Sequence, residues 1–546
     1  MTDFNFAEVN ETIAAAIPDR EVLVWRERRL THRVLAERSR RLANLLLSRG
    51  LRVSKERAQL AGHESGQDHL AIYLYNGNEY VEAMLGAFKA RVAPLNVNYR
   101  YVEEELTFLF KDSRAKAVIY QAEFAPNIAA IRHALPELSL LIQVADDSGN
   151  ALLPGAVDYE EALASASAAL PPVTPTPDDL YILYTGGTTG MPKGVLWRSA
   201  DIYASAMGGR RADGRELASL EEIADHAKNG PGLRSLIGPP LMHGAAQWGL
   251  FINLGMGNSC FFANENKKLE PADFLRTIER EKIHSITIVG DAFARPLLDE
   301  MATGKHDLST LLIVGSGGAP LSAANKREFL ARVPQATVLD SIGSSETGMQ
   351  ATNPSNKQTG VSTGDFRPLA GAGVVSADLT RVLAPSDDEL GWFAQSGRVP
   401  LGYFGDAAKT AKTFPVIDGV RWSVPGDRAR YRADGSIEVL GRDSVTINSG
   451  GEKIFAEEVE HALKHHPAVF DVVVAGRASE RWGQEVVAIV QLRPGSTTAP
   501  ADLLAECGKH LARYKHPKQF VFRDQIQRSP SGKADYRWAK EQAEKG

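Results

Sequence analysis

The sequence predicts an α/β protein with a large N-terminal part and a small C-terminal part. Apolar strand-like runs alternate with helical patterns through most of the 546 residues, and a chain of this length with 43% hydrophobic residues needs more than one core. After residue 442 the pattern changes to a short α+β texture, with a charged helix at 456–466, an apolar strand at 469–476 and a basic tail. We therefore expect an N-terminal domain at 1–442, built from α/β subdomains, and a C-terminal α+β domain at 443–546.

The elements follow one another as strand, helix and strand. Residues 69–98 read as one such unit, and a proline-punctuated connector at 171–179 is expected to mark a seam between subdomains. A second series covers 309–348, with glycine-rich turns at 315–318 and at Gly343. Both turns follow strand carboxyl ends, where open α/β sheets bind ligands.

Composition excludes several classes of protein. The net charge is −5 and the 62 basic residues are scattered, so nucleic-acid binding is not expected. Cys260 and Cys507 cannot build a disulfide framework, which fits a reducing compartment, and the 13 histidines show no metal-binding spacing. No leader pattern and no run of 18 apolar residues is present, so we expect a cytoplasmic protein, with peripheral membrane association left open.

The stretch "LYTGGTTGMPKGVLWR", residues 183–198, has the composition of a phosphate-binding loop. It follows a buried strand predicted at 180–184, and its glycines let backbone amides approach an anion closely. The candidate ligands of a polyphosphate are Thr185, Gly186, Gly187, Thr188, Thr189, Gly190 and Lys193. It is not a Walker A loop, because Lys193 follows Pro192 and precedes Gly194. A flexible surface turn is the alternative.

Six motifs in one order resemble the adenylate-forming enzymes, which include acyl-CoA synthetases, peptide-synthetase adenylation domains and beetle luciferases. The motifs are "YTGGTTGMPKG", "GSGGAP", "GSSETG", "VPGDRARYRADGSIEVLGRDS", "INSGGEKIFAEEVE" and "RSPSGKADYR". The resemblance spans roughly residues 20 to 540. Residues 62–106 and 184–198 resemble bacterial long-chain fatty acyl-CoA synthetases, particularly those acting on steroid side-chain carboxylates.

The resemblance implies roles for residues around ATP. Glu346 would hold Mg²⁺ on the phosphates, a task that suits a hard carboxylate, and its alternative is a solvated loop residue. Lys193 would contact pyrophosphate, and Lys533 would reach the α-phosphate and the substrate carboxylate during adenylation. The other implied nucleotide-site residues are Thr185, Gly318, Ala319, Pro320, Ser345, Asp427 at the ribose hydroxyls and Arg442 near the ribose and phosphate. Arg442 in an interdomain salt bridge is the alternative for that residue.

The resemblance also implies an acyl pocket and a path for CoA. His243 and Gly318 would lie beside the acyl group, although a core histidine bonded to a backbone carbonyl is the alternative for His243. Gly450, Gly451, Glu452 and Lys453 would line the pantetheine path after the mobile C-terminal domain rotates. Four positions depart from the family pattern: Gly187 replaces a serine, Ile342 an aromatic residue, Pro425 a threonine, and Ser444 an acidic or basic hinge residue.

The sequence thus predicts an ATP-dependent acyl-CoA synthetase that activates a long-chain or bulky apolar acid, with a steroid side chain as one hypothesis. ATP, Mg²⁺ and CoA are the expected cofactors and co-substrates. Two alternatives stay open: an enzyme that loads a carrier-protein thiol, and a nucleotide-binding regulator that has lost catalysis. The expected partners are small molecules, with a homodimer as an open alternative to a monomer.

Overall fold

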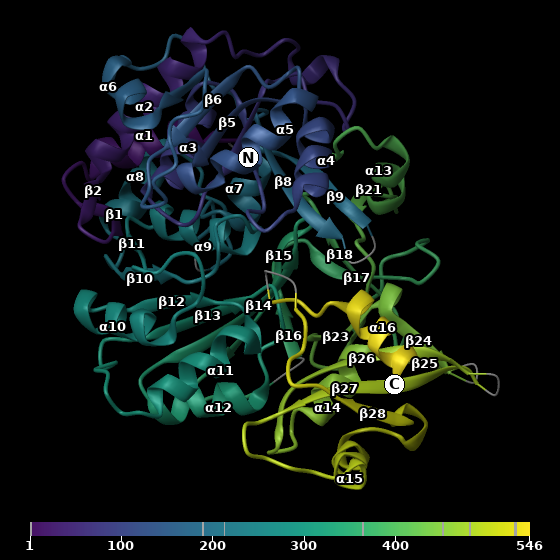
Figure 1. Ribbon diagram of the computed structural model, residues 1–546. Helices are drawn as coiled ribbons and strands as arrows, with labels where there is room; N and C mark the ends of the chain where they lie inside the picture. The colour runs from purple at the N-terminus through teal and green to yellow at the C-terminus, as the bar shows by residue number, and fades with distance from the viewer. Residues whose placement is uncertain are drawn as a thin grey trace.

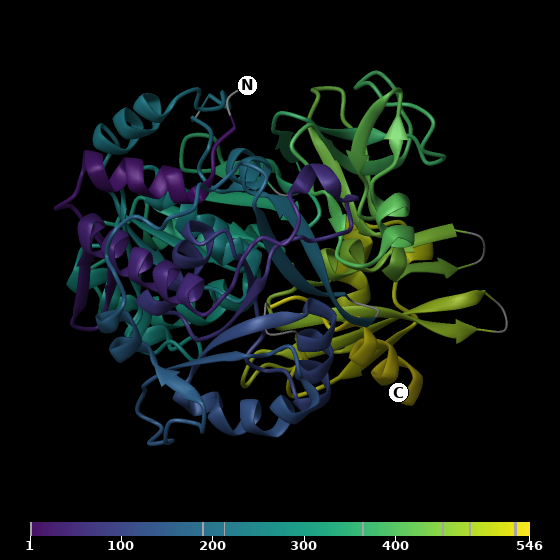
Figure 2. The same cartoon turned by 90° about the horizontal axis from the view of Figure 1, so that it is seen from above.

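The computed structural model describes residues 3–187, 190–211, 213–362, 365–449, 452–479, 482–528 and 532–546. Within them the strands form three sheets, and the third sheet, built by the C-terminal segment, lies beside the larger body that the first two form (Figures 1 and 2).

The first sheet is parallel except at one edge. Its order is β19-β9-β8-β4-β3-β5-β6-β7, and all neighbours from β8 to β7 run parallel. Every residue of β3 is buried, as expected of a strand covered by helices on both faces. The strands are β3 (His69–Tyr73), β4 (Ala93–Asn96), β5 (Ala115–Gln121), β6 (Leu140–Val144), β7 (Ala156–Asp158), β8 (Leu180–Gly187), β9 (Gly190–Arg198) and β19 (Gly402–Tyr403).

The second sheet changes from parallel to antiparallel at β14. Its order is β2-β1-β11-β10-β12-β13-β14-β15-β16-β23-β22-β18-β21-β20, with β17 paired to β18. The strands are β1 (Glu21–Trp25), β2 (Arg28–Thr31), β10 (Arg234–Ile237), β11 (Ser259–Phe262), β12 (Ser285–Ile288), β13 (Ile313–Gly317), β14 (Thr337–Ser344), β15 (Gly348–Ser355), β16 (Asp365–Pro368), β17 (Ala372–Val375), β18 (Gly391–Ser396), β20 (Val416–Ile417), β21 (Val420–Ser423), β22 (Asp427–Tyr431) and β23 (Ile437–Arg442).

Helices pack in layers around these two sheets. One apolar core places α1, α2, α3 and α9 between the sheets, a second joins α4 and α5 to the first sheet, and a third joins α10, α11 and α12 to the second. The helices are α1 (Phe6–Ala16), α2 (His32–Ser48), α3 (Asn78–Lys89), α4 (Glu103–Ser113), α5 (Ala125–Ile131), α6 (Tyr159–Ser165), α7 (Ser199–Ala206), α8 (Leu220–Lys228), α9 (Gly244–Gly255), α10 (Pro271–Glu281), α11 (Gly290–Met301), α12 (Ala323–Arg332) and α13 (Ala407–Thr413). Short 3₁₀ helices are η1 (Arg57–Gln59), η2 (Ala122–Phe124), η3 (Arg132–Ala134), η4 (Asp443–Val445) and η5 (Arg513–Lys515).

The third sheet has the order β25-β24-β27-β26, with β28 paired to β27. Separate apolar clusters join it to α14 and α15 and to α16. Its elements are β24 (Thr446–Ser449), β25 (Glu452–Phe455), α14 (Ala456–Leu463), β26 (Val469–Ser479), β27 (Gly483–Leu492), α15 (Pro500–His510), β28 (Gln519–Phe522) and α16 (Tyr536–Lys545). The predicted α/β class with a small C-terminal α+β part is confirmed.

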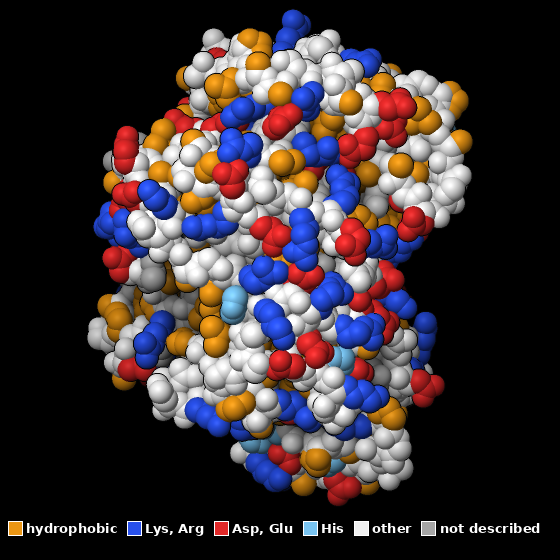
Figure 3. Space-filling model, turned by 90° about the vertical axis from the view of Figure 1, so that its left-hand side faces the viewer, with side chains coloured by type: hydrophobic (Ala, Val, Ile, Leu, Met, Phe, Trp, Pro, Cys, Tyr) orange, Lys and Arg blue, Asp and Glu red, His pale blue; other side chains and the backbone are white. Residues whose placement is uncertain are grey.

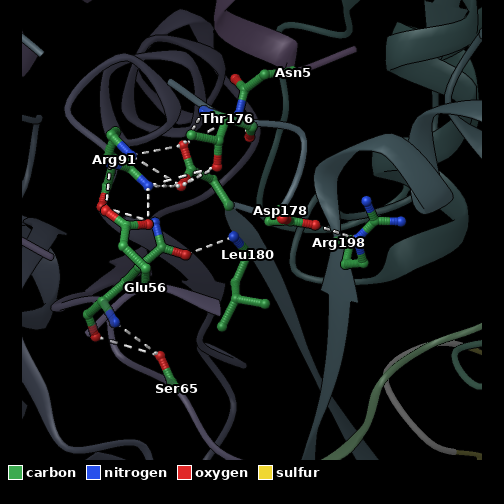
Figure 4. A network of polar contacts seen from close by, with 10 residues as sticks. Asn5, Glu56, Ser65, Arg91, Thr176, Asp178, Leu180 and Arg198 are labelled. Carbon is green, nitrogen blue, oxygen red and sulfur yellow. Dashed lines mark hydrogen bonds and ion pairs between the residues drawn. The ribbon is translucent and has the colours of Figure 1, made fainter. Parts of the chain in front are cut away.

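The prediction of a subdomain seam at 171–179 is wrong. The strand that follows the connector, β8, pairs with β4 in the same sheet as the strands before it. Ion pairs also hold the connector in place (Figure 4). Arg91 pairs with Asp179 of the connector and with Glu56. Arg198 donates to Asp178 of the connector at 2.6 Å. The connector therefore leads into another strand of the same sheet, and the Arg91 and Arg198 ion pairs hold it in place.

The surface carries both signs of charge. On the face in Figure 3 acidic and basic side chains are interspersed, with no large basic patch. Among the residues that the structure describes, no helix combines the length and apolar composition that a membrane span requires.

Candidate active site

A cavity of about 1650 Å³ opens at the carboxyl ends of β13 and β14. Its lining also includes one face of α9, strand β12, residues between 204 and 211, parts of β24 and β26, and the segment around Lys533. Among the residues predicted from sequence, those that line it are Thr185, His243, Gly318, Ser345 and Lys533. The fold therefore gathers five predicted residues from distant parts of the chain around one space.

The glycine-rich stretch is a hairpin for most of its length, where the sequence predicted a loop. Strand β8 continues to Gly187 and β9 begins at Gly190, so that Thr185 lies opposite Lys193 and Gly187 opposite Gly190. The ammonium group of Lys193 lies 3.5 Å from an Asp406 carboxylate oxygen. Predicted Thr188 and Thr189 lie outside the described residues, and of predicted Gly186 only the backbone is described, within β8.

The predicted adenine segment leaves the end of β13. Gly318 has φ +83°, a left-handed conformation that favours glycine, and it lines the cavity. Ala319 and Pro320 follow, and the Pro320 carbonyl accepts a hydrogen bond from the Asp291 amide at the start of α11, at 3.0 Å. Ile342 of β14 borders the same cavity, so an aliphatic side chain stands where an aromatic one is usual in the family.

Glu346 is held by three contacts of its loop. The Tyr403 hydroxyl donates to its carboxylate at 2.7 Å, and the Ser423 hydroxyl donates to its backbone carbonyl at 2.6 Å. The indole of Trp197 donates to the neighbouring Ser345 carbonyl at 2.8 Å. Burial and the nearby Glu346 carboxylate raise the pKa of Tyr403, so this phenol stays protonated and acts as a donor. The loop glutamate is therefore oriented rather than freely solvated.

Asp427 and Arg442 lie opposite each other on β22 and β23. The Arg442 Nε lies 3.3 Å from Asp427 Oδ1. The ion pair that the structure gives Arg442 thus joins neighbouring strands of one sheet, and does not cross between domains. The pair presents one carboxylate and one guanidinium side by side.

The Lys533 ammonium lies near the charges of three predicted residues. Its side chain is exposed to the open cavity; desolvation by the surrounding protein lowers its pKa and Arg442 lowers it further, while the carboxylates of Glu346 and Asp427 oppose that shift. Across the cavity, burial and the charges of Lys533 and Arg100 lower the pKa of His243 to about 3, so its imidazole is neutral near pH 7. The His243 Nε2 is buried and has no hydrogen-bond partner among the described residues.

The predicted CoA-path residues belong to the hairpin of β24 and β25. Ser449 lies opposite Glu452, and Lys453 continues β25. Gly450 and Gly451 lie outside the described residues, as do the side chains of Glu452 and Lys453. Thr446 and Ile447 at the start of β24 line the cavity, and from there the hairpin extends away from β12, β13 and β14 (Figures 1 and 2).

Sequence reasoning missed three residues of the site: Tyr403, Trp197 and Asp406. Tyr403 contacts Glu346, 57 positions away, and Trp197 contacts Ser345, 148 positions away. Asp406 contacts Lys193 across 406 − 193 = 213 positions. The available signal for Tyr403 and Asp406 was "GYFGD" at 402–406, in which two glycines bracket the tyrosine and precede the aspartate.

Two family models match the chain. "AMP-binding enzyme" matches residues 10–386, and "AMP-binding enzyme C-terminal domain" matches residues 458–533. Among solved structures, the anthranilate CoA ligase AuaEII in complex with anthranoyl-AMP has a TM-score of 0.83 at 20% identity, covering 99% of this chain and 98% of its own. ATP-bound MatB from Rhodopseudomonas palustris has a TM-score of 0.79 at 24% identity, covering 98% and 99%. At these identities the structures show the shared fold.

Curated relatives match over full length. "Medium-chain acyl-CoA ligase Mig" of Mycobacterium avium is 57% identical, covering all of this chain and 99% of its own length. "3-oxocholest-4-en-26-oate--CoA ligase" of Rhodococcus rhodochrous is 40% identical, covering 98% of this chain and 96% of its own. The chain therefore belongs to the AMP-binding enzyme family, with acyl-CoA ligases as full-length relatives, as its motifs predicted.

Proposed function

We propose that this chain is an ATP-dependent acyl-CoA ligase for a medium- to long-chain or bulky apolar carboxylic acid. The observation that carries the proposal is the position of Lys533, which lines the cavity near Glu346, Asp427 and Arg442. The chemistry needs a cation there, because negative charge accumulates when a carboxylate approaches a phosphate. The identity to ligases over the whole chain supports the same class.

The reaction has two displacement steps. An oxygen of the substrate carboxylate bonds to the α-phosphorus of ATP, the bond to the bridging β-oxygen breaks, and pyrophosphate leaves with that electron pair. The CoA sulfur then bonds to the acyl carbon, the acyl–phosphate bond breaks, and AMP leaves while solvent takes the thiol proton. The proposed role of Lys533 is to stabilise the α-phosphate charge in the first step, with Thr185 and Lys193 on the pyrophosphate.

The residues around Glu346 fit Mg²⁺. Its carboxylate and the Thr185 hydroxyl are hard oxygen donors. This donor set fits Mg²⁺, which is usually held by one or two carboxylates together with substrate phosphates. When bound, the ion neutralises phosphate charge. The protein contributes by orienting the Glu346 carboxylate through the Tyr403 hydroxyl.

The proposed acyl site is the part of the cavity along α9. Its wall there is mostly apolar, with Trp248, Ile252 and Met256 from α9 and its C-cap, and it continues past Gly249 to β12. His243, neutral and at the N-cap of α9, is the proposed neighbour of the acyl carbonyl. A panel of carboxylic acids with ATP and CoA, followed by AMP release, tests this assignment. Preference for acetate or benzoate over medium-chain, long-chain and sterol acids would overturn it.

Two lysine variants test the division of roles. Lys533→Ala is expected to stop acid-dependent pyrophosphate exchange, and Lys193→Ala to raise mainly the ATP requirement, because only the first touches the α-phosphate in this scheme. Lys545→Ala, at the end of α16, is the matched control and should retain exchange. Exchange that survives Lys533→Ala, or equal loss of both half-reactions in both variants, would contradict the scheme.

The acyl acceptor is a separate question. "Fatty acid--[acyl-carrier-protein] ligase ScoC" of Streptomyces coeruleorubidus is 28% identical over 94% of this chain, which makes a carrier thiol the second candidate. Turnover of the acyl-adenylate with free CoA, compared with a phosphopantetheinylated carrier, decides between them. We expect CoA, as in the more similar relatives.

We also infer a domain boundary at 442/443. Strand β23 of the second sheet ends at Arg442, and β24 opens the third sheet at Thr446. A homodimer and a cytoplasmic location with peripheral membrane attachment are further proposals, tested by sedimentation and by cell fractionation.

A further inference from the structure

A largely shielded ion pair connects the C-terminal unit to α11. Lys464, at the C-cap of α14, places its ammonium 3.1 Å from Asp291 Oδ2. The two side chains are 13% and 16% exposed, so solvent screens the pair weakly. The contact joins two residues 173 positions apart.

Asp291 is fixed within the large body. Its other carboxylate oxygen accepts from the Ser322 amide at 2.8 Å and from the Asn325 side chain at 2.7 Å. Its own amide donates to the Pro320 carbonyl, at the end of the proposed adenine segment, at 3.0 Å. The carboxylate that receives Lys464 therefore has a defined position relative to the nucleotide site.

The pair continues through charged groups to Lys533. Lys464 also lies 3.7 Å from Asp471, whose two oxygens each accept from Arg528 at 2.6 Å. Arg528 in turn donates to the Gly532 carbonyl at 3.1 Å, directly before Lys533. The chain of contacts runs from α11 to the backbone of the proposed adenylation lysine.

A second contact brings the same turn of α11 to the Lys533 segment. Gly532 has φ +76°, and a Cβ built on it would lie 3.2 Å from the Ala292 side chain and 3.4 Å from that of Val289. This backbone therefore packs closely on Val289 and Ala292, two positions before Asp291 and one after it. Two independent contacts thus fix the position of the Lys533 segment against α11.

We propose that Asp291 and Lys464 are positioning residues, which set the C-terminal unit on α11 and, through Asp471 and Arg528, hold Lys533 at the cavity during adenylation. The inference rests on the proposed role of Lys533. Because the CoA step does not use Lys533 in the proposed scheme, loss of this pair should affect the two half-reactions unequally.

The test measures the half-reactions separately on the full chain. Lys464→Met is expected to lower kcat of pyrophosphate exchange about tenfold, with KM for ATP and acid changed less than about twofold, because the cavity lining stays intact. Thioester formation from supplied acyl-adenylate and CoA should stay within about twofold of the parent. Lys464→Arg, which keeps the charge, should restore most of the exchange.

Asp291→Asn keeps an acceptor for the Ser322 amide and removes the negative charge that Lys464 contacts. The same loss of pyrophosphate exchange is expected, so this variant replaces Lys464→Met if that variant does not fold. The double variant should be no worse than either single one, since both remove the same contact. The matched control is Lys515→Met, which removes a 2.6 Å pair with Glu458 that lies wholly within the C-terminal unit. It should leave exchange unchanged.

Equal loss of both half-reactions in Lys464→Met and Asp291→Asn would overturn the positioning role and indicate a purely structural one. Unchanged exchange in both would overturn it as well. A parent protein without exchange, or exchange that survives Lys533→Ala, would instead show that the proposed function has failed.

Discussion

At the scale of single residues, the site depends on how one carboxylate is oriented. The Tyr403 hydroxyl fixes Glu346, and the ammonium of Lys409 lies 4.1 Å from the centre of the Tyr403 ring. A hydrogen bond to a charged group contributes about 1.5–3 kcal/mol, which is enough to select one side-chain orientation. In the proposed scheme this preorganises the Mg²⁺ ligand before MgATP binds.

Tyr403→Phe is therefore expected to raise the Mg²⁺ concentration needed for half-maximal pyrophosphate exchange about tenfold, because Glu346 loses its donor. A Mg²⁺ titration at fixed ATP measures this. Tyr120→Phe is the matched control, since that hydroxyl donates at 3.0 Å to the neutral Gln143, within the first sheet. An unchanged Mg²⁺ requirement in Tyr403→Phe would exclude the orienting role.

At the scale of elements, α9 forms one wall of the proposed acyl site. The α9 side chains and glycines on the cavity wall include Ala245, Gly249, Ile252 and Asn253, which recur with helical spacing. The 12-residue helix is about 18 Å long at 1.5 Å per residue, so an extended chain can lie along several turns. At Gly249 the helix faces β12 closely, because a Cβ there would lie 3.4 Å from the Thr287 hydroxyl, an ordinary van der Waals distance.

Substitutions at Gly249 should change chain-length preference. Gly249→Ala fits the available space and should keep the substrate profile, whereas Gly249→Leu should lower kcat/KM for long-chain and sterol acids at least about tenfold while short acids still react. The measurement is AMP release across the acid panel. A uniform fall for all chain lengths would mean that Gly249 does not border the acyl path.

At the scale of the whole molecule, the docking of the C-terminal unit should respond to pH. A Cβ built on Gly441 would meet the Glu457 carboxyl of α14, so this group lies at the junction of the second and third sheets. Burial and then the charges of Glu460 and Asp427 raise the pKa of Glu457 to about 8, although Arg442 and Lys464 oppose the shift. The folded protein therefore retains a proton that the unfolded chain releases near pH 4.5.

Stability contributed by this proton is complete below pH 4.5 and declines as pH rises to about 8, with a slope of at most about 1.4 kcal/mol per pH unit. Glu457→Gln is expected to flatten this part of the profile. Melting temperatures from pH 5 to 9 test it, with Glu458→Gln, the next residue of α14, as a control that keeps the slope. Parallel profiles for parent and Glu457→Gln would contradict the prediction.

The sequence by itself determined the class of fold, the family and the position of the glycine-rich turns that border the cavity. These are local properties: alternating strands and helices predict an α/β fold, and glycines at strand ends leave backbone amides open to an anion. Glu346 and Lys533 could be named because each lies in a short motif, and the structure places Lys533 on the cavity wall close to the Glu346 charge.

Only the tertiary structure decided which distant residues complete the site. The glycine-rich stretch at 183–198 forms a hairpin because β9 pairs with β8. The connector at 171–179 has a defined position because Arg91 and Arg198 form ion pairs with its aspartates. The contacts of Tyr403 with Glu346 and of Lys464 with Asp291 join residues far apart along the chain. Such contacts depend on the packing of whole sheets against one another, which periodicity and motif spacing do not encode.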